Sequence, residues 1–232
     1  FKIHANMDPK HRDRLAFVKI VSGTFKRNAP YLHVRNGKKV KFSSPNAFFA
    51  EKKEIVEESY PGDIVGLHDT GNFKIGDTLT EGEQLNFKGI PSFSPEHFRY
   101  VNNADPMKAK QLYKGLDQLM DEGVAQLFTL DMNGRRVIGT VGALQYEVIQ
   151  YRLEHEYGAK CSYENLHVHK ACWVEAEDEK NEEFKEFKRV KQRYLAKDKQ
   201  GQLVFLADSA FTIQMTQSKF PTVKLHFVSE YK

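Results

Sequence analysis

Four side chains in the second half of the sequence carry the sulfur and nitrogen atoms that bind zinc: Cys161, His167, His169 and Cys172. Thiolate and imidazole groups are the common zinc ligands in proteins. Their spacing, C-x5-H-x-H-x2-C, matches no established ligand pattern. In a strand the two histidines would share one face and Cys172 would lie on the other. We therefore interpret these four residues as ordinary strand residues. The alternative is that they form the metal site of a small metallohydrolase.

Two short fragments imitate catalytic motifs. Asp69-Thr70-Gly71 matches the aspartic-protease triplet, but that chemistry needs a second carboxylate, and Asp208-Ser209-Ala210 lacks the glycine. The first fragment is typical of a turn. His11-Arg12-Asp13 resembles a kinase catalytic loop, yet Val18 stands where the metal-binding Asn would be needed. Neither fragment predicts an active site.

A phosphate-cradling loop is missing from the sequence. No G-x-x-x-x-G-K-[ST] pattern occurs, and Gly37-Lys38-Lys39 follows a turn instead of a strand. The sequence therefore predicts no catalytic residue, no metal site, no cofactor site and no GTP hydrolysis by this chain.

Basic side chains are the remaining candidates for a functional role. Residues 1–50 hold eleven Lys and Arg against two acids, whereas residues 51–90 hold four against nine. Clustered bases attract polyanions through phosphate contacts that read little sequence. The alternative is a set of scattered, solvent-facing side chains. The candidate nucleic-acid contacts in this region are Lys10, His11, Arg12, Arg14, Lys26, Arg27, Arg35, Lys38, Lys39 and Lys41.

Arg135 and Arg136 could make a second contact, because they follow the Asn133-Gly134 turn. A solvated hairpin tip is an equally good interpretation of this pair.

The elements that would position the first basic cluster are short strands. Residues 31–35 and 38–42 alternate on either side of Asn36-Gly37, a dipeptide that tolerates a tight hairpin turn. Pro61-Gly62 marks another turn. Frequent turns and no convincing helix predict a closed barrel of six to eight strands over residues 1–90.

Residues 91–232 show a different pattern. A strand near residues 98–101, a helix opened by Asp105-Pro106 and a hairpin over Asn133-Gly134 lead to a second helix at 143–157. An extended run at 161–174 follows, and the order predicts a ferredoxin-like β-α-β-β-α-β domain. We expect Leu144, Val148 and Tyr151 to share one face of that second helix. The tail predicts a C-terminal extension of one helix at 182–195 and extended runs at 203–208, 211–215 and 223–228, and no internal repeat is visible.

Composition limits the class of protein. Two cysteines make no disulfide framework, and no apolar run approaches the roughly 18 residues of a membrane helix. We expect a soluble, cytoplasmic chain that makes no membrane contact. Because the sequence opens at Phe1 on a strand-like pattern, we also expect it to be a piece cut from a longer protein.

Several segments resemble one family. The run Asn6-Met7-Asp8-Pro9-Lys10-His11-Arg12-Asp13-Arg14, the segment FVKIVSG at 17–23 and Gly89-Ile90-Pro91 are similar to the second domain of the release factor 3 family, the class II peptide chain release factors. Residues 142–148 resemble a helix start in the third domain of elongation factor G and its relatives, and residues 182–188 resemble the release-factor tail.

The resemblance implies a function. This family consists of ribosome-dependent GTPases that remove class I release factors during translation termination. It implies that the barrel lies against small-subunit rRNA and the third domain near small-subunit protein. GTP, GDP and magnesium would belong to the protein's own GTPase domain, which precedes this segment in the family. The same-class alternative is a fragment of elongation factor G or of a ribosome-protection GTPase.

Overall fold

A computed structural model describes residues 1–5, 14–49, 52–85, 87, 94–178 and 180–229. The chain divides into two compact units, one built from Phe1–Pro91 and Asp121–Gly123 and the other from Ser92–Met120 and Val124–Lys232.

The first unit is made of short antiparallel strands. Strand β2 pairs along its length with β9, from Arg14 opposite Asp69 to Lys19 opposite Ile64. Its described strands form sheets in the orders β1-β2-β9-β6-β7, β10-β4-β5 and β3-β8. Their bounds are β1 Lys2–Ala5, β2 Arg14–Lys19, β3 Phe25–Lys26, β4 Tyr31–His33, β5 Lys38–Val40, β6 Asn46–Phe49, β7 Lys52–Ile55, β8 Glu58–Ser59, β9 Ile64–Asp69 and β10 Leu79–Thr80.

These sheets bear out part of the expected barrel, its short antiparallel strands, and its closure stays a prediction. Among the described residues the ladders remain three separate sheets, and no pairing closes them into a ring. A core that includes Ile20, Phe25 and Leu67 holds the unit together.

The predicted hairpin after Tyr31 is confirmed, with a wider turn than expected. β4 and β5 pair with His33 opposite Lys38, and a 3-10 turn at Val34–Asn36 joins them. Gly37 closes the turn at φ +66°, a left-handed conformation that suits glycine. The strand therefore ends at His33 and not at Arg35, because Arg35 belongs to the turn.

In the second unit the described strands form one antiparallel sheet in the order β14-β11-β13-β12-β16-β17-β15-β18. The chain runs β-α-β-β-α-β twice in succession. The first run is β11 His97–Asn103, α1 Ala109–Asp121, β12 Gln126–Leu130, β13 Arg136–Thr140, α2 Gln145–Tyr157 and β14 Cys161–Asn165. The second run is β15 Lys170–Ala176, α3 Glu182–Lys191, β16 Leu195–Lys197, β17 Leu203–Ala207, α4 Ala210–Lys219 and β18 Val223–His226.

This second run corrects the expectation of a simple tail extension. Residues 211–215, expected to be extended, lie in α4, and β16 was not expected at all. The first run confirms the predicted β-α-β-β-α-β order, with strand order 4-1-3-2, and the second run repeats that order in reverse. The two repeats join edge to edge through their second strands, where Leu130 lies opposite Ala196.

The repeats match in register as well as in order. From β13 through α2 and from β17 through α4, residues 67 apart have nearly the same burial, beginning with Val137 and Val204. The buried helix positions Tyr146, Ile149 and Leu153 correspond to Ile213, Thr216 and Phe220. Very few of these paired residues are identical, which is why the sequence shows no repeat.

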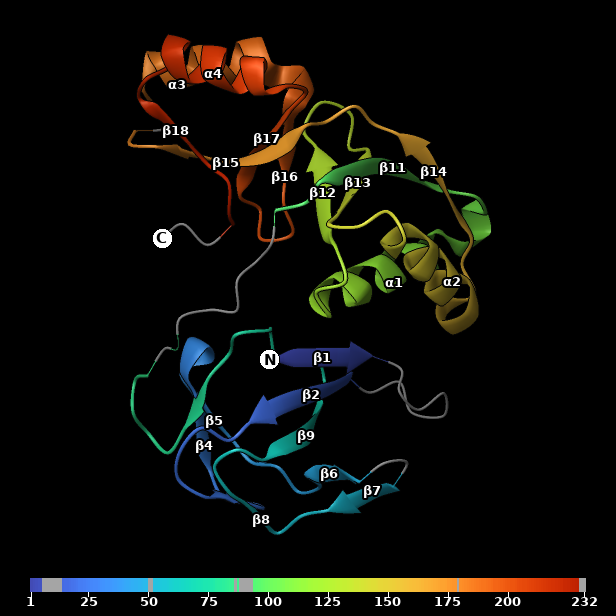
Figure 1. The fold of residues 1–232 in the computed structure, drawn as a ribbon, viewed down its shortest axis with the longest axis vertical. Coiled ribbons are helices and arrows are strands. Elements are labelled where there is room, and N and C mark those ends of the chain that lie inside the picture. The colour runs from blue at the N-terminus through green and yellow to red at the C-terminus, as the bar shows by residue number, and fades with distance from the viewer. Residues whose placement is uncertain (6–13, 50–51, 86, 88–93, 179, 230–232) are drawn as a thin grey trace. The chain divides into compact units, whose positions relative to one another are not determined.

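The helices cover one face of the sheet. Figure 1 shows α1 and α2 along the first four strands and α3 and α4 along the last four. Each repeat has a core of its own, and the other face of the sheet carries one more. This further core spans both repeats and includes Phe128 and Trp173. Their ring centroids are 6.1 Å apart. In a flat sheet, strands three positions apart would be separated by about 14 Å. The two side chains therefore meet across the two strands, β16 and β17, that lie between them.

The face that α2 buries differs from the expected one. Tyr146, Ile149 and Leu153 pack into the core, whereas Leu144, Val148 and Tyr151 are exposed. Since α2 carries apolar side chains on both faces, the packing against α1 and β14 decides which face is buried.

Among the described residues, no helix is long and apolar enough to cross a membrane.

Candidate nucleic-acid interface

Arg14 lies inside the first unit and not on its surface. It begins β2 and is 6% exposed. Its Nη2 atom is 3.2 Å from Oδ2 of Asp69 and donates a hydrogen bond of 2.7 Å to the carbonyl oxygen of Phe73. A guanidinium buried against a carboxylate cannot reach a phosphate without breaking that pair. Arg14 is therefore removed from the candidate surface.

Arg35 is also part of the scaffold. Its Nε donates to Oδ1 of Asp77 at 2.6 Å, and its Nη2 donates to the carbonyl oxygen of Asn72 at 2.6 Å. Burial alone would raise the pKa of Asp77, but hydrogen bonds from Arg35, the Lys74 amide and His33 outweigh burial and lower it. The hydrogen bond to Asp77 raises the pKa of Arg35. This network fixes the β4–β5 turn against the loop before β10.

Arg27 and Lys26 face acidic partners. Arg27 donates through Nη1 to Glu57 at 2.6 Å and through Nε to the carbonyl oxygen of Ser43, also at 2.6 Å. Lys26 lies 3.5 Å from Glu58 across the β3–β8 pair, with both side chains exposed. Exposed pairs of this kind contribute at most about 1 kcal/mol, so they can reopen when a stronger anion approaches.

Lys38, Lys39 and Lys41 differ from these arginines. All three are exposed, and none has a carboxylate partner within the part of the chain that the structure describes. Among the strands that the structure describes, β5 pairs with β4 alone and so lies at the edge of its sheet. Lys39 lies on the face of β5 opposite to the core face that Val40 shares with Tyr31, and Lys41 directly follows the strand. These lysines form the free cationic edge of the unit.

Lys10, His11 and Arg12 lie outside the described residues. Their part in the candidate surface stays a prediction.

Arg135 and Arg136 each cover an aromatic ring in the second unit. The guanidinium carbon of Arg135 is 3.5 Å from the centre of the Tyr100 ring, and the side chain also pairs with Glu164. The guanidinium carbon of Arg136 is 4.0 Å from the centre of the Tyr113 ring. Both side chains are half-buried, so neither is the freely solvated tip considered from the sequence.

The acidic partners were missed in the sequence, although a signal was present. Glu57, Glu58, Asp69 and Asp77 all come from the acidic segment 51–90. The negative charge of this segment neutralises much of the positive charge of residues 1–50. A charge map of the chain therefore overstates the free basic surface unless the two segments are considered together.

The motif-like fragments have structural roles. Asp69 ends β9, and its Oδ1 accepts hydrogen bonds from the amides of Gly71 and Asn72, which confirms the predicted turn. Cys161 and Cys172 are buried in different cores. Within the described residues there is no group of three or more His, Cys, Asp and Glu that could hold a metal.

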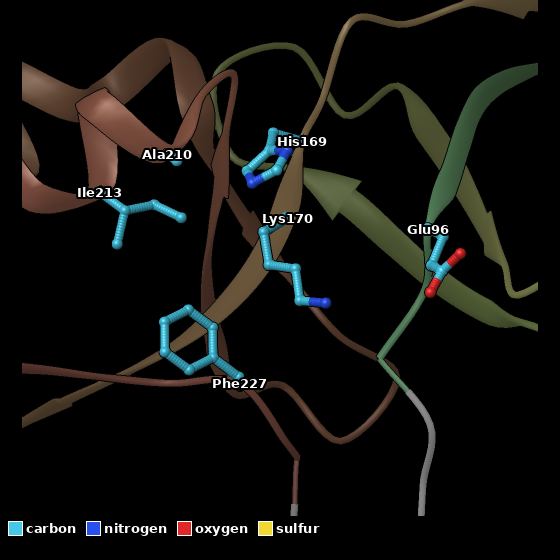
Figure 2. Close-up of a pocket in the computed structure, with 6 residues that line it drawn as sticks. All are labelled: Glu96, His169, Lys170, Ala210, Ile213 and Phe227. Atoms are coloured by element: carbon cyan, nitrogen blue, oxygen red, sulfur yellow. The ribbon is translucent and has the colours of Figure 1, made fainter.

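An open hollow of about 590 Å³ lies in the second unit, lined by Glu96, His169, Lys170, Ala210, Ile213 and Phe227 (Figure 2). Lys170 lies between the apolar side formed by Ile213 and Phe227 and the carboxylate of Glu96 (Figure 2). Its lining offers no Ser, Cys or Thr nucleophile for His169 to activate.

Residues 1–82 match the family described as elongation factor G domain 2, so the first unit is a translation-factor domain. Residues 87–217, more than half of the chain, match the family described as class II release factor RF3, C-terminal domain. The chain therefore belongs to the class II release factor RF3 family. The matched parts are the domains that follow the GTPase domain in these translational GTPases.

A solved structure has a similar fold. The crystal structure of ttk003000868 from Thermus thermophilus superposes with a TM-score of 0.61 and 19% identity over 72% of this chain. The chain spans 25% of that protein's length. At this identity the likeness shows the fold alone.

Proposed function

We propose that this chain is the ribosome-docking region of a class II release factor that recycles class I release factors during translation termination. Membership of the RF3 family supports the role. In this proposal residues 1–90 are the second domain and residues 91–232 the third domain of the full-length protein. Its partners are small-subunit rRNA and protein, its own GTPase domain and, functionally, the class I release factors. Such a role implies a cytoplasmic location.

Nucleotide chemistry belongs elsewhere in this proposal. GTP, GDP and magnesium would be held by the GTPase domain, since this sequence lacks a phosphate-binding loop. The chain would act as a docking arm with no catalytic residue. No observation on the described residues favours the metallohydrolase alternative.

The observation that carries the docking proposal is the edge strand with free lysines. Lys38, Lys39 and Lys41 are exposed, whereas Arg14, Arg27 and Arg35 are held by carboxylates of the same unit. Ammonium groups on flexible lysine stems, exposed on β5 and directly after it, can follow a phosphate backbone at little cost in reorganisation. We infer that these lysines touch rRNA, with Lys26 and Arg27 as secondary contacts and Lys10, His11 and Arg12 as further candidates.

Directed hydroxyl-radical probing tests this contact. An iron chelate is tethered through a Lys39→Cys substitution and the protein is bound to small ribosomal subunits. Cys161 and Cys172 are buried, so only the introduced thiol takes the label. The expected result is strand cleavage confined to a small set of neighbouring rRNA positions. Lys114→Cys on α1, also exposed, is the matched control. Equal cleavage patterns from both positions, or none from position 39, would contradict the contact.

A further inference from the structure

Three ionisable side chains line the hollow shown in Figure 2. Glu96, His169 and Lys170 make no side-chain hydrogen bond or ion pair within the part of the chain that the structure describes. The volume of the hollow, about 590 Å³, lies within the range of roughly 300–1,000 Å³ that is typical of small-molecule sites. Such sites combine apolar walls with a few polar groups, and Ile213 and Phe227 supply the apolar wall here (Figure 2).

The first repeat has a place equivalent to this hollow. His97 lies opposite Thr140 at the start of β11, and Lys170 lies opposite Ala207 at the start of β15. In both repeats the amide of the preceding residue donates to the carbonyl oxygen of that strand partner, at 2.9 Å in the first repeat and 2.7 Å in the second. Lys170 is therefore the equivalent of His97.

Tyr146 fills that place in the first repeat. Its side chain reaches from α2 to β11 and donates a hydrogen bond of 2.8 Å to the carbonyl oxygen of His97. The equivalent residues of the second repeat, Ile213 and Lys170, both line the hollow. An isoleucine side chain ends well before the position of a tyrosine hydroxyl, so a space remains between α4 and β15. The hollow therefore corresponds to the position of an aromatic ring in the first repeat.

The charges of the hollow match the other end of an aromatic amino acid. A free amino acid carries its carboxylate and its ammonium group on one carbon, next to the side chain. In the hollow, the side chain of Lys170 lies between the apolar wall and the carboxylate of Glu96 (Figure 2). A ring on the apolar wall would therefore bring its carboxylate to Lys170 and its ammonium group toward Glu96.

We propose that this hollow binds a free aromatic amino acid, phenylalanine or tyrosine. The ring lies against Ile213 and Phe227, the ligand's carboxylate pairs with Lys170, and its ammonium group pairs with Glu96. His169 also lines the hollow and is exposed, so it supplies a second donor for the carboxylate. The inference goes beyond ribosome docking and does not depend on it, because ligand binding is measured on the protein alone.

The first test is a titration of the protein with L-phenylalanine, followed by nuclear magnetic resonance. Amide signals of residues 169–170 and 210–213 should move most, with a dissociation constant of about 1 mM or below. Phenylethylamine lacks the carboxylate, 3-phenylpropanoate lacks the ammonium group and L-alanine lacks the ring, so each should bind about tenfold more weakly or worse. Equal binding of L-phenylalanine and any of these analogues, or no saturable shift at these residues, would overturn the proposal.

A further probe separates a free amino acid from a residue inside a protein. N-acetyl-L-phenylalanine amide keeps the ring but carries neither charge, as within a peptide chain. It should bind at least about tenfold more weakly than L-phenylalanine. Equal or tighter binding would mean that the hollow receives an aromatic side chain of a partner protein, and the proposal would be wrong.

Single substitutions assign the two charged groups. Lys170→Met keeps most of the length of the side chain without its charge and should weaken L-phenylalanine binding about tenfold, as should Glu96→Gln. In Lys170→Met the advantage of L-phenylalanine over phenylethylamine should disappear, which a general loss of structure would not produce. Lys110→Met, at an exposed position of α1, is the matched control. If either hollow variant binds L-phenylalanine as tightly as this control, the assignment fails.

The last variant fills the hollow from inside. Ile213→Tyr gives the second repeat the side chain that the first repeat has at the equivalent position. It should abolish L-phenylalanine binding, while thermal unfolding shows that the chain stays folded. If Ile213→Tyr does not fold, Ala210→Leu, at an exposed position of the lining, obstructs the hollow instead. Undiminished binding by a folded variant of either kind would refute the site.

Discussion

Arg35 and Asp77 form a two-point ion pair, with Nε to Oδ1 at 2.6 Å and Nη2 to Oδ2 at 2.8 Å. The carboxylate of Asp77 also accepts a hydrogen bond from the amide of Lys74 and lies 2.7 Å from Nε2 of His33. A guanidinium group is well suited to bind phosphate with two hydrogen bonds, but that of Arg35 is already paired with Asp77 of the same unit. The neighbouring Lys38, Lys39 and Lys41 are exposed and can contact a binding partner.

The Asp77 network predicts a pH-dependent stability for the first unit. Because the pKa of Asp77 is lowered below its ordinary value of 3.8, its contribution is present above pH 3.8 and is lost as the pH falls through the folded-state pKa. Asp77→Asn should cost about 2 kcal/mol at pH 7 and progressively less below pH 3.8. Hydrogen exchange of peptides from β4 and β5 measures the difference. A gap between wild type and variant that stays constant from pH 7 to pH 3 would count against the network, with Glu81→Gln as the exposed control.

The two cysteines should be unreactive in the folded protein. Burial raises the pKa of the Cys172 thiol to about 12 and also raises that of Cys161. Since the thiolate is the reactive form, a disulfide reagent at pH 8 should modify neither thiol until the second unit unfolds. Both should then react in 6 M guanidinium. Fast labelling of one thiol in buffer would show that its core is not packed as described.

The contact between Phe128 and Trp173 predicts that the two repeats unfold together. Phe128 is fully buried, and Phe128→Ala should cost about 4 kcal/mol. Trp173 is the single tryptophan of the chain and lies in the other repeat. Its fluorescence transition in urea should shift to lower concentration together with the circular dichroism signal. A tryptophan transition that does not move would mean that the repeats are independent.

Gly115 predicts an unusual sign for a helix substitution. Alanine normally stabilises a helix interior by roughly 1 kcal/mol relative to glycine. Here a Cβ atom would lie 2.7 Å from Cδ2 of Leu153 and 2.8 Å from Cγ of Tyr157 on the neighbouring helix. Gly115→Ala should therefore destabilise the second unit by about 2 kcal/mol. The pair Gly115→Ala with Leu153→Ala should show favourable coupling in a double-mutant cycle, and simple additivity would argue against the close packing.

Local chemistry made the turns and caps predictable. Asp105 caps the first helical turn by accepting a hydrogen bond from the amide of Met107 at 3.0 Å, as Asp105-Pro106 predicted. Gly134 and Gly158 have positive φ angles at the predicted hairpin and helix end. Each of these features depends on residues only a few positions apart.

Long-range packing was not predictable in the same way. The partners of Arg14 and Arg35 lie 55 and 42 residues away in sequence, so no local pattern reveals that these cations are occupied. The burial of α2 was ambiguous because apolar residues occur on both of its faces. The start of α4 resembles a strand at Phe211-Thr212-Ile213. The cap at Ser209, which accepts from the amide of Thr212 at 3.1 Å, was the overlooked signal.

The most direct test of the docking account is the salt dependence of ribosome binding by a triple variant, Lys38→Glu, Lys39→Glu and Lys41→Glu. The control carries the same charge change at Lys108, Lys110 and Lys114, which are exposed on the second unit. The account predicts that the variant at Lys38, Lys39 and Lys41 binds ribosomes more weakly than the wild type. For this variant alone, the slope of log affinity against log salt concentration should be shallower by about one unit per lysine. Equal slopes for both variants and the wild type would contradict it.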